Sequence, residues 1–166
     1  MEKRGRFAVE IIEAVRAAVG CDFPIILRWS QWKQQDYTVR LAPSPEELER
    51  FLMPLSEAGV DIFHCSQRRF WEPEFEGSDL NLAGWTRKIT GKPAITVGSV
   101  GLDAVFTPLP GEHTFREADT ASLDELLRRM DAQEFDLVAV GRALIANPDW
   151  VDMVQHHRHE ELKPFR

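Results

Sequence analysis

The sequence predicts an α/β protein built on a parallel sheet of four strands. Short apolar runs alternate with segments of helical periodicity along the chain, and the runs carry few polar residues. Such runs are typical of parallel strands in a sheet that helices cover on at least one face. Two architectures fit: an open doubly wound sheet, or part of a (β/α)8 barrel. A complete barrel needs about 250 residues, so a chain of 166 residues with four strands is at most half of one.

The amino-terminal part predicts one helix and one strand. Apolar residues recur at helical spacing from Phe7 to Val19, and Gly20 stands where a glycine ends a helix. The apolar run 23–27 contains Pro24 near its start and is expected to form a buried strand. Arg28 therefore follows the expected end of this strand.

The second helix has a strong start signal. Ser44 can cap the helix, Pro45 suits its first position, and Glu47 completes a capping box. We expect this helix to run to Ala58, with a kink at Pro54.

Three more strands and three more helices are expected after it. The strands are expected at 60–65, 93–97 and 135–140, and the helices at 82–89, from 122 to 133 and from 149 to 157. Ser122 with Glu125 forms a second capping box, and the segment 147–149 is expected to cap the last helix. The segment 102–120 predicts an irregular loop.

The composition narrows the class of protein. The chain carries 20 Lys and Arg against 27 Asp and Glu, a formal net charge of −7, which argues against a nucleic-acid or anionic-membrane partner. Two cysteines are too few for a disulfide scaffold, and no apolar run is long enough to span a membrane. No apolar signal-peptide segment follows the first residues. We therefore expect one soluble cytoplasmic domain, residues 1–166.

The residues that follow the strands carry the candidate chemistry, because functional groups of parallel α/β folds collect at the carboxyl ends of the strands. In strand order these residues are Arg28, Trp29 and Ser30; Ser66, Gln67 and Arg68; Gly98 and Ser99; Gly141 and Arg142. Glycine lets backbone N–H groups approach an anion, and arginine adds a bidentate guanidinium, so the last two strand ends predict a phosphate site. A single glycine at a strand end is more often a turn residue than part of a phosphate site. Arg28, considered by itself, is more often a solvated or salt-bridged side chain than a catalytic one.

Four motifs make the sequence resemble one family. Gly141 to Trp150 is similar to the terminal signature of the old yellow enzyme family, the NADH:flavin oxidoreductases that include FMN-dependent ene-reductases. Val97 to Gly101 resembles the phosphate turn after strand 7 of that family, Ile26 to Ser30 its strand 5, and Glu2 to Phe7 the start of the preceding helix. This resemblance implies the second half of a (β/α)8 TIM barrel, from helix 4 through helix 8.

The resemblance implies a flavin cofactor and roles for five residues. Arg28 would be catalytic, facing FMN where negative charge develops on reduction. Backbone N–H groups of Gly98, Ser99, Gly141 and Arg142 would hold the FMN phosphate. NADH or NADPH would be the reductant, and an activated alkene such as an enone the small-molecule substrate.

The resemblance also implies that half of the active site lies outside this chain. The substrate-anchoring residues and the proton-donating tyrosine of that family lie in the first half of the barrel, and the only tyrosine here, Tyr37, follows the first strand of the second half. Whether this chain is itself an enzyme is left open. We expect the half barrel to pair with a first-half chain or with a second copy of itself. The alternative is a non-catalytic half-barrel fragment, or a partner subunit that complements a first-half chain.

Other conspicuous residues have structural explanations. His64 and Cys65 fall inside an expected strand and are interpreted as packed side chains, because no further metal ligands stand at workable spacing. Three histidines near the carboxyl end are not expected to form a metal site, because neighbouring residues of a helix mostly point in different directions: His156, His157 and His159. The aromatic segment from Trp71 to Phe75 is the one we expect to shape access of the substrate.

Overall fold

Four parallel strands form one sheet in the order in which they occur along the chain. The computed structural model describes residues 2–33, 35–104 and 117–166. The strands are β1 (Ile26–Ser30), β2 (Ile62–Ser66), β3 (Ala94–Thr96) and β4 (Leu137–Val138), paired in the order β1-β2-β3-β4. A doubly wound sheet reverses its strand order at a switch point, whereas neighbouring strands of a barrel follow the chain. The order is therefore that of a barrel segment.

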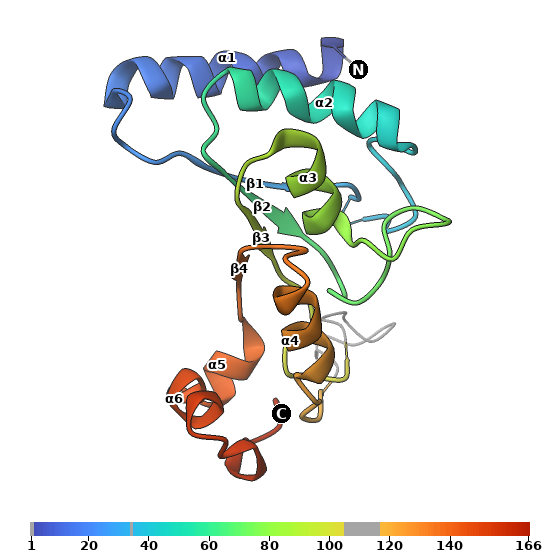
Figure 1. Ribbon diagram of the computed structural model, residues 1–166, viewed down its shortest axis with the longest axis vertical. Coiled ribbons are helices and arrows are strands. Elements are labelled where there is room, and N and C mark those ends of the chain that lie inside the picture. The colour runs from blue at the N-terminus through green and yellow to red at the C-terminus, as the bar shows by residue number, and fades with distance from the viewer. Residues whose placement is uncertain (1, 34, 105–116) are drawn as a thin grey trace.

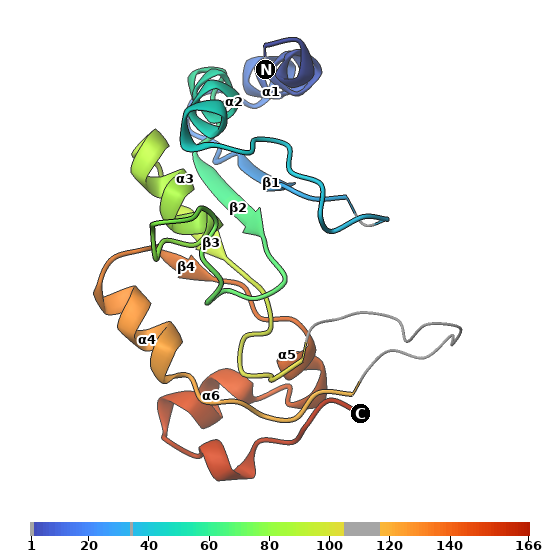
Figure 2. The same cartoon turned by 90° about the vertical axis from the view of Figure 1, so that its right-hand side faces the viewer.

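Helices connect the strands and cover one face of the sheet. In chain order they are α1 (Glu2–Val19), α2 (Pro45–Glu57), α3 (Leu82–Thr90), α4 (Asp124–Asp131), α5 (Arg142–Ala146), α6 (Trp150–Gln155) and the 3-10 helix η1 (His159–Glu161). α1 packs beside α2, and α3 packs on β2 and β3 (Figure 1). In the view turned by 90°, α2, α3 and α4 lie along one side of the sheet, and the described chain places no helix across the opposite side of β1 to β3 (Figure 2).

The core lies between the sheet and these helices. Trp29, Phe63 and Cys65 alternate along their strands with more exposed residues and are at most 8% exposed. α2 adds three fully buried leucines at helical spacing: Leu48, Leu52 and Leu55. Burying one such side chain contributes roughly 1.5–3 kcal/mol, so this layer is a main source of stability.

The opposite face of the sheet is uncovered. Ile26 of β1 and Leu137 of β4 are 53% and 48% exposed. In a closed barrel the corresponding face is filled by side chains from all the strands. The structure therefore presents the inner layer of a barrel without the strands that would cover it.

A second apolar surface lies on α1. Its four residues, the α1 stripe, recur every fourth position and so share one helix face: Phe7, Ile11, Val15 and Val19. They are 73%, 47%, 40% and 39% exposed. An amphipathic helix ordinarily buries this face. The helix α1 itself lies at the β1 end of the sheet, where a further barrel element would adjoin (Figure 1).

The predicted ends of the first two helices and the predicted start of the second are confirmed, whereas α1 begins at Glu2, five residues before Phe7. Gly20 follows α1 with φ +83°, the left-handed conformation that glycine favours. The Ser44 hydroxyl accepts from the N–H of Glu47 at 3.3 Å, and Pro45 opens α2. α2 continues through Pro54 to Glu57.

Several predicted boundaries are wrong. β1 begins at Ile26 rather than at Phe23, because Pro24 has no N–H for the strand ladder and Phe23 is 60% exposed. The capping box of Ser122 and Glu125 does not form. Leu123 is the N-cap of α4, and Glu125 instead pairs with arginines of its own helix.

The carboxyl-terminal part also differs from the prediction. α5 was not expected, since five residues are too few to show helical periodicity. Within the predicted segment 147–149, Asp149 occupies the N-cap position of α6 but makes no side-chain capping hydrogen bond. Asn147 does not cap α6. Its side chain donates to the Lys163 carbonyl at 3.0 Å and accepts from the Lys163 N–H at 2.8 Å, which ties the end of the chain to α5. Most of the expected loop 102–120 lies outside the described residues.

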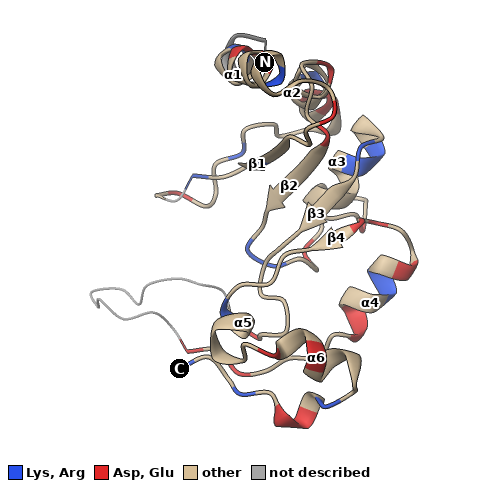
Figure 3. Cartoon of the chain, turned by 90° about the vertical axis from the view of Figure 1, so that its left-hand side faces the viewer, with Lys and Arg blue, Asp and Glu red and all other residues tan. Residues whose placement is uncertain are grey.

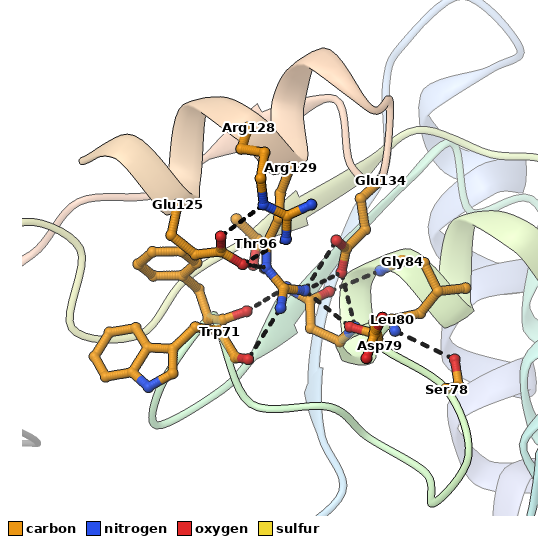
Figure 4. Close-up of polar contacts among 12 residues, drawn as sticks. Trp71, Ser78, Asp79, Leu80, Gly84, Thr96, Glu125, Arg128, Arg129 and Glu134 are labelled. Carbon is orange, nitrogen blue, oxygen red and sulfur yellow. Dashed lines mark hydrogen bonds and ion pairs between the residues drawn. The ribbon is translucent and has the colours of Figure 1, made fainter. Parts of the chain in front are cut away.

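A buried ionic cluster fixes the segment that follows β2. Arg129 of α4 donates to Glu134 at 2.9 Å, and both side chains are only 7% exposed. Arg129 also donates to the main-chain oxygens of Trp71 at 3.1 Å and Asp79 at 2.9 Å, and Glu134 accepts from the N–H of Asn81 at 2.8 Å (Figure 4). The cluster therefore holds this segment against α4.

Candidate functional site

A cavity of about 690 Å³ opens at the carboxyl ends of the strands. It brings together all five residues that the sequence nominates, from three strand ends far apart in the chain: Arg28, Gly98, Ser99, Gly141 and Arg142. The volume is in the range of about 300–1,000 Å³ that ligand pockets occupy. The convergence follows from the parallel sheet, which places these ends at one edge.

Arg28 lies within β1 and not after it. The register pairs Arg28 with His64, and the Arg28 guanidinium lies 3.5 Å from the hydroxyl of Ser66 on the next strand. Burial, and secondarily the charge of Arg28, lowers the pKa of the His64 imidazole. Arg28 is exposed on the uncovered face of the sheet, so its charge points into the space that a barrel would enclose.

The turn after β3 requires glycine. Gly98 has φ +125°, and a Cβ there would lie 2.8 Å from the carbonyl oxygen of Gln67. Ser99 follows with φ +49°, and its hydroxyl lies within hydrogen-bond distance of the carbonyls of Arg68 at 3.2 Å and Ala104 at 3.0 Å. The N–H groups of Gly98 and Ser99 donate to no other described residue. They remain available to an anion.

The fourth strand end adds an open glycine and a positioned arginine. A Cβ built at Gly141 would meet nothing within 4 Å, so a ligand can approach this backbone closely. The Arg142 guanidinium donates to the Ala104 carbonyl and lies 5.7 Å from the centre of the Phe165 ring. Burial lowers the pKa of Arg142, and Asp103 opposes that shift. The charge of Arg142 is therefore held at the cavity wall.

The cavity is positively charged in an acidic chain. Arg28, Arg68 and Arg142 line it, whereas no Asp or Glu is among its described lining residues. Figure 3 shows the strands almost entirely uncoloured, with basic segments in the loop after β2 and beside α5. Since the net charge of the chain is −7, this concentration of positive charge is local and favours an anionic ligand.

The sequence did not identify every lining residue. Tyr37 and Phe165 line the cavity, and neither of them follows a strand directly. Gln67 and Arg68 follow β2 directly, so their position at a strand end marks them as candidates, although the sequence assigns them no role. Phe165 arrives through its pairing with the distant Ala118, which no local pattern indicates.

The aromatic segment after β2 lies beside the main cavity, and its role in substrate access stays a prediction. Trp71 packs edge-on against Phe70 with ring centres 5.1 Å apart, and Phe75 against Trp85 at 5.3 Å. Neither Trp71 nor Phe75 lines the main cavity. The three residues between them instead line an adjoining recess of about 150 Å³: Glu72, Pro73 and Glu74.

The structure offers no metal cluster in the part of the chain it describes. No three His, Cys, Asp or Glu side chains within residues 2–33, 35–104 and 117–166 could hold a metal ion together. Cys65 is fully buried beside Thr86, with 3.3 Å between Sγ and Oγ1, and burial raises its pKa to about 12. This thiol is a packing group.

Comparison with known proteins gives the family. No family model matches the chain. A "NADH oxidase" of Thermoanaerobacter brockii is 33% identical over 170 residues, which cover 98% of this chain and 22% of that protein. The structure of the old yellow enzyme homologue from Zymomonas mobilis has a TM-score of 0.64 at 17% identity, over 98% of this chain and 39% of the other. The resemblance to the old yellow enzyme family is confirmed.

A second solved structure agrees. A 2-naphthoyl-CoA reductase complex has a TM-score of 0.65 at 18% identity, over 99% of this chain and 23% of that chain. The chain therefore spans about a fifth of the curated relative and about two fifths or less of these two structures. The fold is that of the second half of the family's barrel. Within the described residues, no helix is long and apolar enough to cross a membrane.

Proposed function

We propose that this chain is the phosphate-binding half of an FMN-dependent NAD(P)H oxidoreductase that reduces activated alkenes such as enones. One observation carries the proposal: Arg28, the Gly98–Ser99 turn and Gly141–Arg142 converge on one positively charged cavity. The name of the curated relative, NADH oxidase, supports NADH or NADPH as the reductant.

The residues present suit the phosphate of FMN. The N–H groups of Gly98 and Ser99 have no other described acceptor, and the backbone at Gly141 is open to a close approach. Arg142 adds a guanidinium, which binds phosphate oxygens in a bidentate geometry. Together these groups would hold a dianion at the ends of β3 and β4.

Arg28 would act on the flavin ring. FMN, when bound, supplies the hydride acceptor and donor of the reaction. A fixed guanidinium on β1 stabilises negative charge on a neighbouring ring without reorganising when that charge develops. We therefore assign Arg28 to stabilising the reduced cofactor.

The remaining active-site groups are proposed to come from outside this chain. The uncovered face with Ile26 and Leu137, and the α1 stripe, are the surfaces that a first-half chain or a second copy would cover. The same exposure favours a second candidate function, a partner subunit that complements a first half without turnover of its own.

The experiment is a visible absorption spectrum after FMN is added and the unbound flavin is removed by desalting. The proposal expects retained flavin bands, and NADPH oxidation in the presence of an enone once a first-half chain is added. Retained flavin without turnover in the completed barrel would favour the partner-subunit function. A colourless protein in both preparations would contradict flavin binding.

A further inference from the structure

We propose that Arg68 forms an anion subsite for the substrate, which is therefore an activated alkene bearing a carboxylate. This substrate class rests on the proposed flavin function and extends it. Three arginines line the cavity, and the flavin proposal assigns only Arg28 and Arg142. The flavin proposal leaves the third positive charge, on Arg68, without an assigned ligand group.

The charge of Arg68 is not neutralised by the described residues. Its Cζ atom lies 4.0 Å from the centre of the Tyr37 ring, and Arg68 forms no ion pair with any residue the structure describes. A ring face attracts the guanidinium but supplies no carboxylate, so the in-plane N–H groups remain donors.

The two neighbouring arginines provide the contrast. Arg69 pairs with Glu72 at 2.7 Å, and Arg40 lies 3.7 Å from Glu74. These carboxylates are thus already matched by positive charge. Arg68 is the arginine in this loop region whose charge is available to a ligand.

Arg68 is also held in place before any ligand binds. Tyr37 packs on Trp32 with ring centres 4.9 Å apart, which fixes the aromatic platform under the guanidinium. On the backbone side, the Ser99 hydroxyl lies 3.2 Å from the Arg68 carbonyl oxygen. A pre-positioned side chain loses little conformational entropy on binding, so the contact with an anion is correspondingly stronger.

The position of Arg68 fits a group that extends from the main cavity into the adjoining recess. The main cavity and the adjoining recess of about 150 Å³ share one wall, which contains Trp32, Tyr37, Ser66, Gln67 and Arg68. Three arginines and two carboxylates line the recess, so its wall is net positive. A carboxylate is planar and small, and it matches the two-pronged donor geometry of a guanidinium.

The test compares a carboxylate probe with its methyl ester, which removes the negative charge and adds one methyl group. Cinnamate and its uncharged methyl ester are titrated calorimetrically into the 166-residue chain, with and without FMN. The wild type is expected to bind cinnamate at least tenfold more tightly than the ester. Arg68→Gln should remove this preference, Arg68→Lys should restore part of it, and the matched control Arg69→Gln should retain it.

The possible failures are distinguishable. Equal affinity of the wild type for both probes, or equal effects of Arg68→Gln and Arg69→Gln, overturns the subsite. An Arg68→Gln variant that loses FMN affinity but keeps the preference for cinnamate assigns Arg68 to the flavin phosphate and also overturns it. A preference that depends on Arg68 in a chain that binds no FMN supports the subsite and contradicts the flavin function. Thermal unfolding of each variant verifies that it is folded.

Discussion

Gly98 shows how one residue couples the fold to the site. A Cβ at this position would lie 2.8–2.9 Å from main-chain atoms of residues 67–69, and φ is +125°. The glycine therefore allows the turn after β3 to pack on the segment after β2. That packing presents the N–H groups of residues 98 and 99 to the cavity.

Gly98→Ala is expected to lower the free energy of unfolding by about 2–3 kcal/mol, since it adds both backbone strain and a clash with rigid main-chain atoms. The control is Gly5→Ala, in α1, where the added Cβ would make only ordinary contact with Phe51 at 3.9 Å. This change should not lower stability, because alanine is the better helix former. Urea unfolding measures both, and equal effects would contradict the packing described.

Arg142→Ala should raise the Kd for FMN at least tenfold, because it removes the guanidinium assigned to the phosphate. Arg6→Ala is the matched control. It removes the same charge from a side chain that is 79% exposed on α1. Fluorescence titration with FMN measures the two constants. Unchanged affinity in Arg142→Ala would mean that the phosphate lies elsewhere.

The sequence could identify the five nominated residues because strand ends in a parallel sheet converge, whatever the connecting segments do. It could not identify Phe165, whose place depends on main-chain hydrogen bonds to Ala118 at 2.9 and 3.0 Å across the carboxyl-terminal part. Nor could it show that Arg68 stacks on Tyr37, since that contact joins two different loops.

At the scale of elements, the buried pair of Arg129 and Glu134 joins α4 to the segment after β2. Removing one partner leaves the other charge buried and unpaired, a loss of about 3–5 kcal/mol. Arg129→Met should therefore be strongly destabilising. Arg128→Met, next to it on the same helix with a side chain 61% exposed, should cost less than about 1 kcal/mol.

Chemical denaturation measures the free energy of unfolding of these two variants and of the wild type. Similar losses in Arg128→Met and Arg129→Met would show that the buried cluster does not stabilise the fold. A large loss confined to Arg129→Met would agree with the burial of its side chain, which is 7% exposed.

Element boundaries were harder to predict than element types. The local sequence suffices to predict where α2 begins, because that start depends on Ser44 and Pro45 within one turn. β1 and β4 are set by pairing with their neighbours, so the apolar runs mark them only approximately. α5 is a single short turn whose place depends on Asn147 and the end of the chain.

For the whole molecule, the uncovered sheet face and the α1 stripe predict association. The wild-type chain, of mass 19.0 kDa, should sediment as a larger species or bind a first-half chain. Ile11→Asp places a charge in the stripe and should weaken this association at least tenfold. Ala17→Asp, on another face of α1, should have little effect.

Analytical ultracentrifugation gives the result. A wild-type chain that remains a 19.0 kDa monomer alone and with a first-half chain would contradict the proposed partner surfaces. The apolar runs predicted a parallel sheet with helices on at least one face, and only the family resemblance implied the strand order of a barrel. The exposure of particular side chains on the second face depends on what is packed there, and so required the structure.

The most direct test of the central proposal, a phosphate-binding flavin site, compares FMN with riboflavin, which lacks the phosphate. The chain, alone or completed by a first half, is titrated with each flavin by fluorescence quenching. If Gly98, Ser99, Gly141 and Arg142 hold the phosphate, FMN should bind at least a hundredfold more tightly, and Arg142→Ala should reduce that ratio. Equal affinity for FMN and riboflavin in the wild type would contradict the proposed phosphate site.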